Sequence, residues 1–202
     1  MTDELALFAG DTPSPHTGGD PYTTYLDTLI NPTSRREMAT CLDRIVTLCT
    51  DGAVTSGRYQ PWHRLTYRET AWIKALLTRQ GWSASYVNKH LAALRRVLEE
   101  AWRLGMMPLD QRERASAVSD LKTTRLPAGR HVSASTVAAV LSACDGDGSP
   151  AGRRDAAIIA ALYSTGCRRA EIAALSLSDY DPLERSLIVM GKRDKQRMVY
   201  LN

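Results

Sequence analysis

The chain has 202 residues, of which 44% are hydrophobic and 24% are charged, so it is long enough for one or two compact domains with their own cores. It contains no apolar run of about 18 residues that could span a membrane, and its acidic N-terminus lacks the basic and apolar regions of a signal peptide. The four cysteines and four histidines are too scattered for a zinc site, so the sequence predicts a protein of the reducing cytoplasm without a metal or another cofactor.

Charge is unevenly distributed along the chain. Residues 1–20 carry four acidic and no basic residues, residues 21–130 carry 17 Lys/Arg against 10 Asp/Glu, and residues 131–202 carry nine against eight. The net charge of the middle region, 17 minus 10, is therefore +7. This charge suits a polyanionic partner, although many soluble proteins carry a similar basic region.

Residues 1–20 are predicted to form a flexible acidic tail. They include two prolines and a pair of glycines, which are typical of irregular segments. A small apolar cluster at Leu5, Leu7 and Phe8 leaves a second interpretation open, in which the tail docks on a neighbouring protomer.

Residues 21–109 are predicted to form a helical domain. Apolar residues recur at helical spacing over about 22–30, 33–50, 66–80 and 83–104, which indicates four helices.

The helix predicted over residues 83–104 carries polar and basic side chains on its outer face. Serine and asparagine near a helix start can bind phosphates, asparagine can read adenine, and arginine can bind phosphate or guanine. A solvated basic face is the alternative interpretation. The candidate DNA-binding residues on this face are Ser85, Asn88, Lys89, Arg95 and Arg96.

Residues 110–130 are rich in charge and contain the run Leu-Pro-Ala-Gly, which predicts a linker between two domains. A second domain is expected over residues 131–202. Its expected elements are a helix over about 133–141, a glycine-rich loop over 145–152, a buried helix over 154–164 and strands within 179–202.

The most informative stretch is Ser-Thr-Gly-Cys-Arg-Arg-Ala-Glu-Ile, at residues 164–172. Gly166 can adopt the positive φ that a sharp turn needs, and a new helical pattern begins at Arg168. Arginines in the first turn of a helix oppose the helix dipole, which suggests that they face an anion. Taken alone, the stretch also fits a helical hairpin with two solvated arginines.

A second motif, Gly-Lys-Arg-Asp-Lys-Gln-Arg, follows at residues 191–197. It lies between two short β-like runs, and its glycine and polar residues predict a hairpin with Lys192 at the tip. Lys195 and Arg197 are candidate contacts to a nucleic-acid backbone, with a solvated hairpin as the alternative.

A Thr-Gly-x-Arg-x-x-Glu-Ile helix start followed by a Gly-Lys-x-x-Lys-x-Arg hairpin resembles the tyrosine recombinases, the phage-integrase and Xer-type family. Residues 83–105 are similar to the last large helix of the core-binding domain in that family. The resemblance covers about residues 21–202. It implies a mainly α fold, with a four-helix SAM-like core-binding domain over 21–109 and the first half of an α+β catalytic domain, including a short β-hairpin, over 131–202.

The resemblance also implies a chemistry. Breaking a DNA phosphodiester without a metal needs a nucleophile, cations for the charge on the non-bridging oxygens, and an acid for the leaving 5′ oxygen. The resemblance assigns the cation role to Arg168 and the acid role to Lys192, while we expect Glu171 to brace the turn or a neighbouring arginine. The implied partners are double-stranded DNA at a recombination site and further copies of the chain on that DNA. The implied location is the nucleoid in the cytoplasm, with no membrane and no small-molecule cofactor involved.

The catalytic residues that the family carries further along have no match within the 202 residues. These are a His-x-x-Arg pair, another His or Trp, and the nucleophilic Tyr. We therefore expect this chain to be the N-terminal part of a recombinase that integrates, excises or resolves DNA, and to be inactive alone. Incubation with a suicide DNA substrate should give no covalent adduct, and a tyrosine-linked adduct would contradict this expectation.

Two other functions stay open from the sequence. The chain could be a non-catalytic DNA-binding protein, or an inhibitor, that acts at recombinase sites. It could also be an α-helical protein-interaction module, which predicts no salt-dependent binding to DNA.

Overall fold

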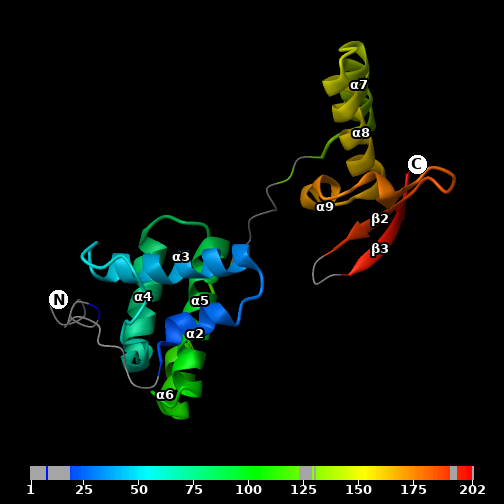
Figure 1. The fold of residues 1–202 in the computed structure, drawn as a ribbon. Helices are drawn as coiled ribbons and strands as arrows, with labels where there is room; N and C mark the ends of the chain where they lie inside the picture. Colours follow the sequence, from blue (N-terminus) through cyan, green and yellow to red (C-terminus); the bar gives the residue numbers. More distant parts are fainter. Residues whose placement is uncertain (1–7, 9–18, 123–128, 130, 192–194, 202) are drawn as a thin grey trace. The chain divides into compact units, whose positions relative to one another are not determined.

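The computed structural model describes residues 8, 19–122, 129, 131–191 and 195–201. The chain divides into two compact units, Met1–Leu126 and Pro127–Asn202 (Figure 1). The first unit is helical and the second combines helices with a small antiparallel sheet. The expected mainly α fold class with a short sheet is therefore confirmed.

Helices of the first unit begin where the sequence offers a side chain that accepts hydrogen bonds from the free N–H groups of the first turn. Asp20, Asn31 and Ser83 act in this way, and Thr66 forms a capping box with Glu69. The elements of this unit are α2 (Pro21–Asp27), α3 (Pro32–Cys49), the 3-10 turn η1 (Trp62–Arg64), α4 (Tyr67–Arg79), α5 (Ala84–Arg103) and α6 (Leu109–Ser116).

Helix α5 is the central element of the first unit, because it contacts α2, α3, α4 and α6. Apolar residues on α5 recur every three or four positions, so they form one buried stripe along the helix. This stripe packs against Leu42, Ile45 and Trp62, which are fully buried. Its buried apolar members are Val87, Leu91, Ala93, Leu94, Val97, Leu98 and Ala101.

Part of the predicted linker belongs to the first unit. Residues 109–116 form helix α6, which packs against α4 and α5. Arg112 forms an ion pair with Glu99 of α5 at 2.6 Å, and the Gln111 side chain donates hydrogen bonds to the carbonyl oxygens of His63 and Leu65. Several of the charges that suggested a linker, those of Asp110, Arg112, Arg114 and Asp120, are therefore used in ion pairs within the unit.

Within the predicted tail, residues 1–20, the structure describes Phe8 and the two residues before α2. Phe8 packs on the first unit. Its side chain is 4% exposed and packs edge-on against Trp62, with 5.3 Å between ring centroids. The other residues of this segment up to 18 lie outside the described residues.

The second unit contains α7 (Ala134–Gly146), α8 (Pro150–Thr165), α9 (Arg169–Ala173), the 3-10 turn η2 (Leu177–Asp179), β1 (Tyr180–Asp181), β2 (Ser186–Met190) and β3 (Gln196–Tyr200). The strands form an antiparallel sheet in the order β1-β2-β3, with Leu187 opposite Val199 and Met190 opposite Gln196. A small core of Cys167, Leu187 and Val189 joins the sheet to α9.

Two expectations for the second unit are wrong in detail. The glycine-rich segment 145–152 is mostly helical, because Ser149 caps α8 and Pro150 occupies its first turn, where proline is well tolerated. Helix α8 is not a buried helix: Gly152 is its buried residue, and Ile158 and Tyr163 are exposed. Among the described residues, α7 and α8 pack on each other and leave much of their apolar surface open.

None of the described helices combines the length and the apolar character that a membrane crossing requires. Within the described residues there is also no group of three or more His, Cys, Asp or Glu side chains arranged to hold a metal ion.

His90 of α5 gives the first unit a testable pH dependence. Its side chain is fully buried between the rings of Trp82 and Tyr86. Its Nδ1 donates a hydrogen bond to the Tyr86 carbonyl oxygen at 2.8 Å, while Nε2 has no hydrogen-bond partner among the described residues. Burial lowers the pKa of His90 below its ordinary value of 6.5, and the nearby cations Arg44 and Lys89 lower it further.

Acid should therefore destabilise the first unit through His90. Because the folded-state pKa lies below 6.5, stability is complete above that pH and falls as the pH drops below it, by at most about 1.4 kcal/mol per pH unit. We expect the free energy of unfolding to fall more steeply between pH 6.5 and 5 in the wild type than in His90→Gln. Urea unfolding at several pH values measures this difference. Equal slopes for the two proteins would show that His90 is not the group responsible.

Candidate functional site

The site in the second unit is organised by the turn between α8 and α9. Gly166 ends α8 with a φ of 62°, the left-handed conformation that glycine adopts without strain. The Thr165 hydroxyl donates to the Ala161 carbonyl oxygen at 2.6 Å and accepts from the Cys167 N–H at 3.2 Å. The chain is thus held on both sides of the turn, and Arg168 becomes the residue that precedes the first turn of α9.

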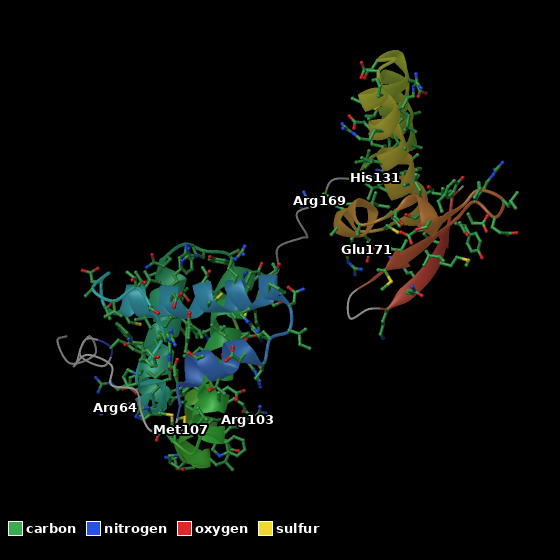
Figure 2. The ribbon with its side chains drawn as sticks, in the orientation of Figure 1. Arg64, Arg103, Met107, His131, Arg169 and Glu171 are labelled. Carbon is green, nitrogen blue, oxygen red and sulfur yellow. The ribbon has the colours of Figure 1, made fainter. Side chains whose placement is uncertain are left out.

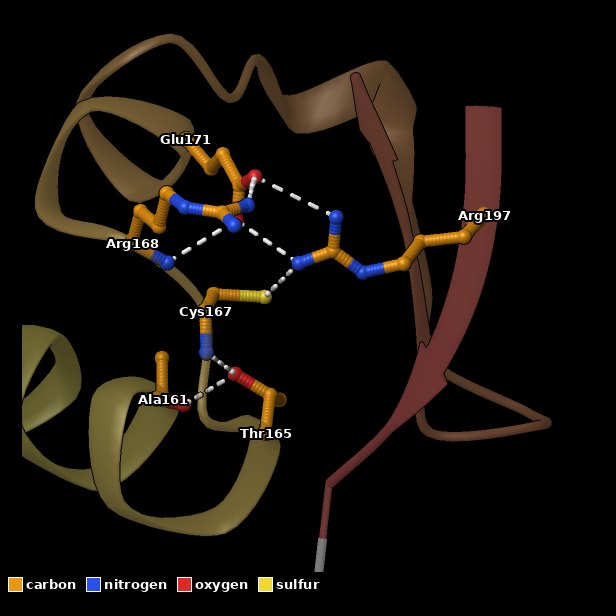
Figure 3. Close-up of polar contacts among 6 residues, drawn as sticks. All are labelled: Ala161, Thr165, Cys167, Arg168, Glu171 and Arg197. Atoms are coloured by element: carbon orange, nitrogen blue, oxygen red, sulfur yellow. Dashed lines mark hydrogen bonds and ion pairs between the residues drawn. The ribbon is translucent and has the colours of Figure 1, made fainter. Parts of the chain in front are cut away.

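Glu171 holds Arg168 in two ways (Figure 3). Its Oε2 accepts the backbone N–H of Arg168 at 2.8 Å, which closes the start of α9, and its Oε1 accepts from the Arg168 guanidinium at 2.9 Å. The Glu171 side chain is 7% exposed, whereas that of Arg168 is 75% exposed. The expected bracing role of Glu171 is therefore confirmed, and the guanidinium of Arg168 remains accessible to a ligand.

Arg197 of β3 also binds the Glu171 carboxylate. Its guanidinium donates to Oε2 of Glu171 at 2.7 Å and to Oε1 at 3.2 Å, and also lies 3.7 Å from the Cys167 sulfur. Two parallel N–H···O bonds of this kind fix the orientation of both groups. Two guanidiniums and one carboxylate leave the cluster Arg168–Glu171–Arg197 with a net charge of +1, so it can attract an anion.

These contacts hold the Glu171 carboxylate in its ionised form. The hydrogen bond from Arg197, followed by that from the Arg168 backbone, lowers the pKa of Glu171 from 4.5 to about 2. Because the folded-state pKa is the lower one, the contribution of this carboxylate to stability is present above pH 4.5 and is lost as the pH falls from 4.5 towards 2.

Removing the Arg197 guanidinium should raise the pKa of Glu171. In Arg197→Met we expect the carboxyl to titrate closer to its ordinary 4.5 than to 2, because the largest stabilising contact of the ionised form is gone. Carbon-13 NMR of labelled Glu side chains measures this titration. Lys195→Met is the matched control, since it removes an exposed cation one residue from β3 that has no contact to Glu171 among those described. An unchanged Glu171 titration in Arg197→Met would refute the assignment.

Lys192 itself lies outside the described residues, but the base of its hairpin is described. Gly191 donates its N–H to the Lys195 carbonyl oxygen at 2.7 Å. A Cβ atom at position 191 would lie 3.2 Å from that oxygen, 3.3 Å from Nη1 of Arg197 and 3.9 Å from Oε1 of Glu171. The residue that precedes Lys192 therefore lies beside the cluster that holds Arg168.

Arg169 is exposed and, like Glu171, lies on α9 (Figure 2). Lys195 is also exposed. Of the two predicted backbone-phosphate contacts Lys195 and Arg197, the structure pairs Arg197 with a carboxylate, that of Glu171.

In the first unit, each basic side chain of α5 has a carboxylate partner. Lys89 lies 3.4 Å from Glu37, Arg95 lies 2.8 Å from Asp120, and Arg96 lies 3.1 Å from Glu100. Arg103 contacts both Glu99 and Glu100. The predicted basic face is therefore a helix surface with interleaved ion pairs, and its net positive charge is smaller than the sequence suggested.

The other two candidates on α5 differ from each other. Ser85 is exposed. Asn88 is partly buried and forms two hydrogen bonds with the backbone of Leu121. This contact could not be predicted from the sequence, because no local signal shows that residues 118–121 return to α5.

Comparison with known proteins supports the resemblance. Residues 130–202 match the model of the phage integrase family. The chain is 32% identical over 144 residues to the tyrosine recombinase XerC of Alcanivorax borkumensis, which covers 69% of this chain and 44% of that protein. It is 30% identical over 138 residues to XerC of Vibrio cholerae, covering 67% of this chain and 42% of that protein. The chain thus spans less than half the length of these relatives.

Solved structures show a similar fold. The integrase of transposon Tn1549 in complex with transposon right end DNA superposes with a TM-score of 0.64 at 15% sequence identity, over 90% of this chain and 60% of that one. The same integrase in complex with circular intermediate DNA gives a TM-score of 0.57 at 15% identity, over 90% of this chain and 59% of that one.

Proposed function

Because the chain belongs to the tyrosine recombinase family, we propose that it binds double-stranded DNA as part of a site-specific recombinase, with Arg168 placed to receive the phosphate at which a strand is exchanged. The observation that carries this proposal is the cluster Arg168–Glu171–Arg197. The Arg168 guanidinium is exposed to solvent, while the buried Glu171 carboxylate accepts the Arg168 backbone N–H at the start of α9.

In the proposed reaction, Arg168 donates parallel hydrogen bonds to the non-bridging oxygens of the phosphate and stabilises the charge that develops there. Its guanidinium stays charged at any relevant pH, so it can act as an electrostatic stabiliser and not as a proton donor. Removing one such donor from an oxyanion site typically costs about 10²–10³ in rate. Glu171 and Arg197 keep Arg168 in place without touching the phosphate.

Lys192 takes the proton-donor role. An ammonium can release a proton to the leaving 5′ oxygen, and its pKa can be shifted by a desolvated site. The position of Gly191 beside the cluster supports this role, because Gly191 directly precedes Lys192 in the sequence. A lysine and an arginine from separate elements would then act on the same phosphate.

Further DNA contacts are proposed for Ser85, Lys89, Lys195 and Arg96, which are exposed or half-buried. Asn88, Arg95 and Arg197 were predicted as contacts too. Lys89 and Arg96 each pair with one carboxylate, whereas Asn88 and Arg95 also bind the backbone of residues 118–121 and Arg197 binds both oxygens of Glu171, so these three have more contacts to give up on binding DNA. We further propose that several copies assemble on the recombination site, and that the protein acts at the nucleoid.

Photo-crosslinking tests which segments touch DNA. The chain is bound to a duplex of about 30 base pairs that carries a photoreactive base at varied positions, and the crosslinked peptides are identified by mass spectrometry. We expect crosslinks in α9, in the hairpin 191–197 and at the N-terminal end of α5. Crosslinks confined to other surfaces, or none with a bound duplex, would refute the proposed interface.

A further inference from the structure

The segment Val118–Leu121, called the strap from here on, follows α6 and has no helical or strand structure of its own. It is nevertheless anchored. Val118 is 6% exposed within the core of the first unit, and Leu121 packs partly buried against the same core. The burial of Val118 and Leu121 alone does not fix the conformation of the backbone between them, which also makes polar contacts.

Asn88 of α5 binds both backbone groups of Leu121. Its Oδ1 accepts the Leu121 N–H at 2.8 Å, and its Nδ2 donates to the Leu121 carbonyl oxygen at 3.0 Å. A side-chain amide can donate and accept at once, so Asn88 pairs with Leu121 as a neighbouring strand would.

Arg95 lies seven residues further along α5, two turns from Asn88 and on the same stripe of the helix. Its guanidinium donates to the Val118 carbonyl oxygen and to the Asp120 carboxylate, the latter at 2.8 Å. Lys74 of α4 adds a contact to the Ser119 hydroxyl at 3.2 Å. Each residue of the strap is therefore held by a side chain or by the core, and the strap runs antiparallel to α5.

We propose that Asn88 and Arg95 are positioning residues that clamp the strap to α5, and so fix the position of Lys122, the last described residue of the first unit before the connection to α7. This inference goes beyond the proposed function, because the clamp exists whether or not the chain binds DNA. It also changes the role of two residues that the sequence predicted as DNA contacts. The Asn88 amide and one nitrogen of the Arg95 guanidinium bind the strap, so we infer that these residues act on DNA binding through the placement of the connection between the units.

A fixed exit point has a physical consequence under the proposed function, in which both units would act on one duplex. Ordering the start of the connection before binding removes part of the entropy that would otherwise be lost on binding. Twelve residues, 122–133, then join the clamp to the first residue of α7. Without the clamp the connection would begin at the end of α6, at Ser116.

Amide hydrogen exchange of the full chain, followed by NMR, tests the clamp. In Asn88→Ala we expect the Leu121 amide to exchange about tenfold faster, as the loss of about one hydrogen bond predicts. Trypsin should also cut faster after Lys122. Asn88→Asp keeps the acceptor for the Leu121 N–H but turns an oxygen towards the Leu121 carbonyl oxygen, so it should lose part of the protection. Lys89→Ala, one residue away and facing Glu37, is the matched control and should leave it unchanged.

Two results would overturn the inference. The first is unchanged Leu121 exchange in Asn88→Ala. The second is faster Leu121 exchange in the wild type when duplex DNA binds, because that is expected if Asn88 and Arg95 release the strap to contact DNA. If Asn88→Ala unfolds the unit, amides of α3 and α4 lose protection in parallel. Arg95→Met then decides, with faster exchange confined to residues 118–121 expected for the clamp and unchanged exchange there contradicting it.

Discussion

Replacing Arg168 with alanine is expected to weaken the binding of duplex DNA by about tenfold, and to reduce the salt dependence of binding by roughly one released counterion. The reason is geometric. The Arg168 guanidinium is 75% exposed, yet its backbone and one of its nitrogens are fixed by Glu171. A cation that is both accessible and held in place loses little side-chain entropy when it binds a phosphate.

Arg169→Ala is the control for this experiment. It removes the same charge from the adjacent position of α9, so it matches any effect of net charge alone. We expect it to weaken binding less than Arg168→Ala does. Arg168→Lys should keep most of the salt dependence but lose affinity, because an ammonium cannot form the bidentate contact. Equal losses in Arg168→Ala and Arg169→Ala would show that Arg168 has no special place.

Replacing Trp62 with alanine is expected to destabilise the first unit by about 3–5 kcal/mol. Its side chain is fully buried, and its indole N–H donates to the Gly57 carbonyl oxygen at 2.8 Å. A Cβ atom at Gly57 would lie 3.0 Å from both the Trp62 and Tyr22 rings, so this region is tightly packed. The loss is expected to be large because small movements of the neighbouring side chains cannot fill the cavity. It would amount to a large part of the stability of an ordinary domain.

Urea unfolding, followed by far-ultraviolet circular dichroism, measures this loss. Trp102→Ala is the comparison, because Trp102 is only half-buried and stacks with Arg112 at the surface of α5. We expect Trp102→Ala to cost clearly less. If the two variants unfold at the same urea concentration, the packing around Trp62 is not the main support of the unit.

The sequence allowed the Arg168 turn to be predicted because its determinants are local. Gly166 ends one helix and Glu171 lies three residues after Arg168, so backbone geometry alone brings the carboxylate to the Arg168 N–H. The pairing of Glu171 with Arg197 was not predicted, since it spans 26 residues and depends on how β2 and β3 align. Sequence spacing suggested a DNA contact for Arg197, whereas the structure directs it to Glu171.

The same limit applies to α5. Helical periodicity correctly separated its buried stripe from its polar side, but it cannot show what covers the polar side. The polar groups of Asn88 and Arg95 bind the strap, which covers this side of the helix. Lys89 and Arg96 pair with carboxylates of α3 and α5. The apolar run of α8 predicted burial, yet its main partner in the described part of the chain is α7, with smaller contacts to α9 and β3, and Ile158 and Tyr163 stay exposed.

The most direct test of this account is the equilibrium affinity of residues 1–202 for duplex DNA over a series of salt concentrations, measured by fluorescence anisotropy. We predict binding at low salt that weakens steeply as salt rises, with a log–log slope that becomes shallower by about one in Arg168→Ala. An absence of binding at low salt, or binding whose salt dependence is the same in the wild type and in Arg168→Ala, would contradict the claim that the Arg168–Glu171–Arg197 cluster receives a DNA phosphate.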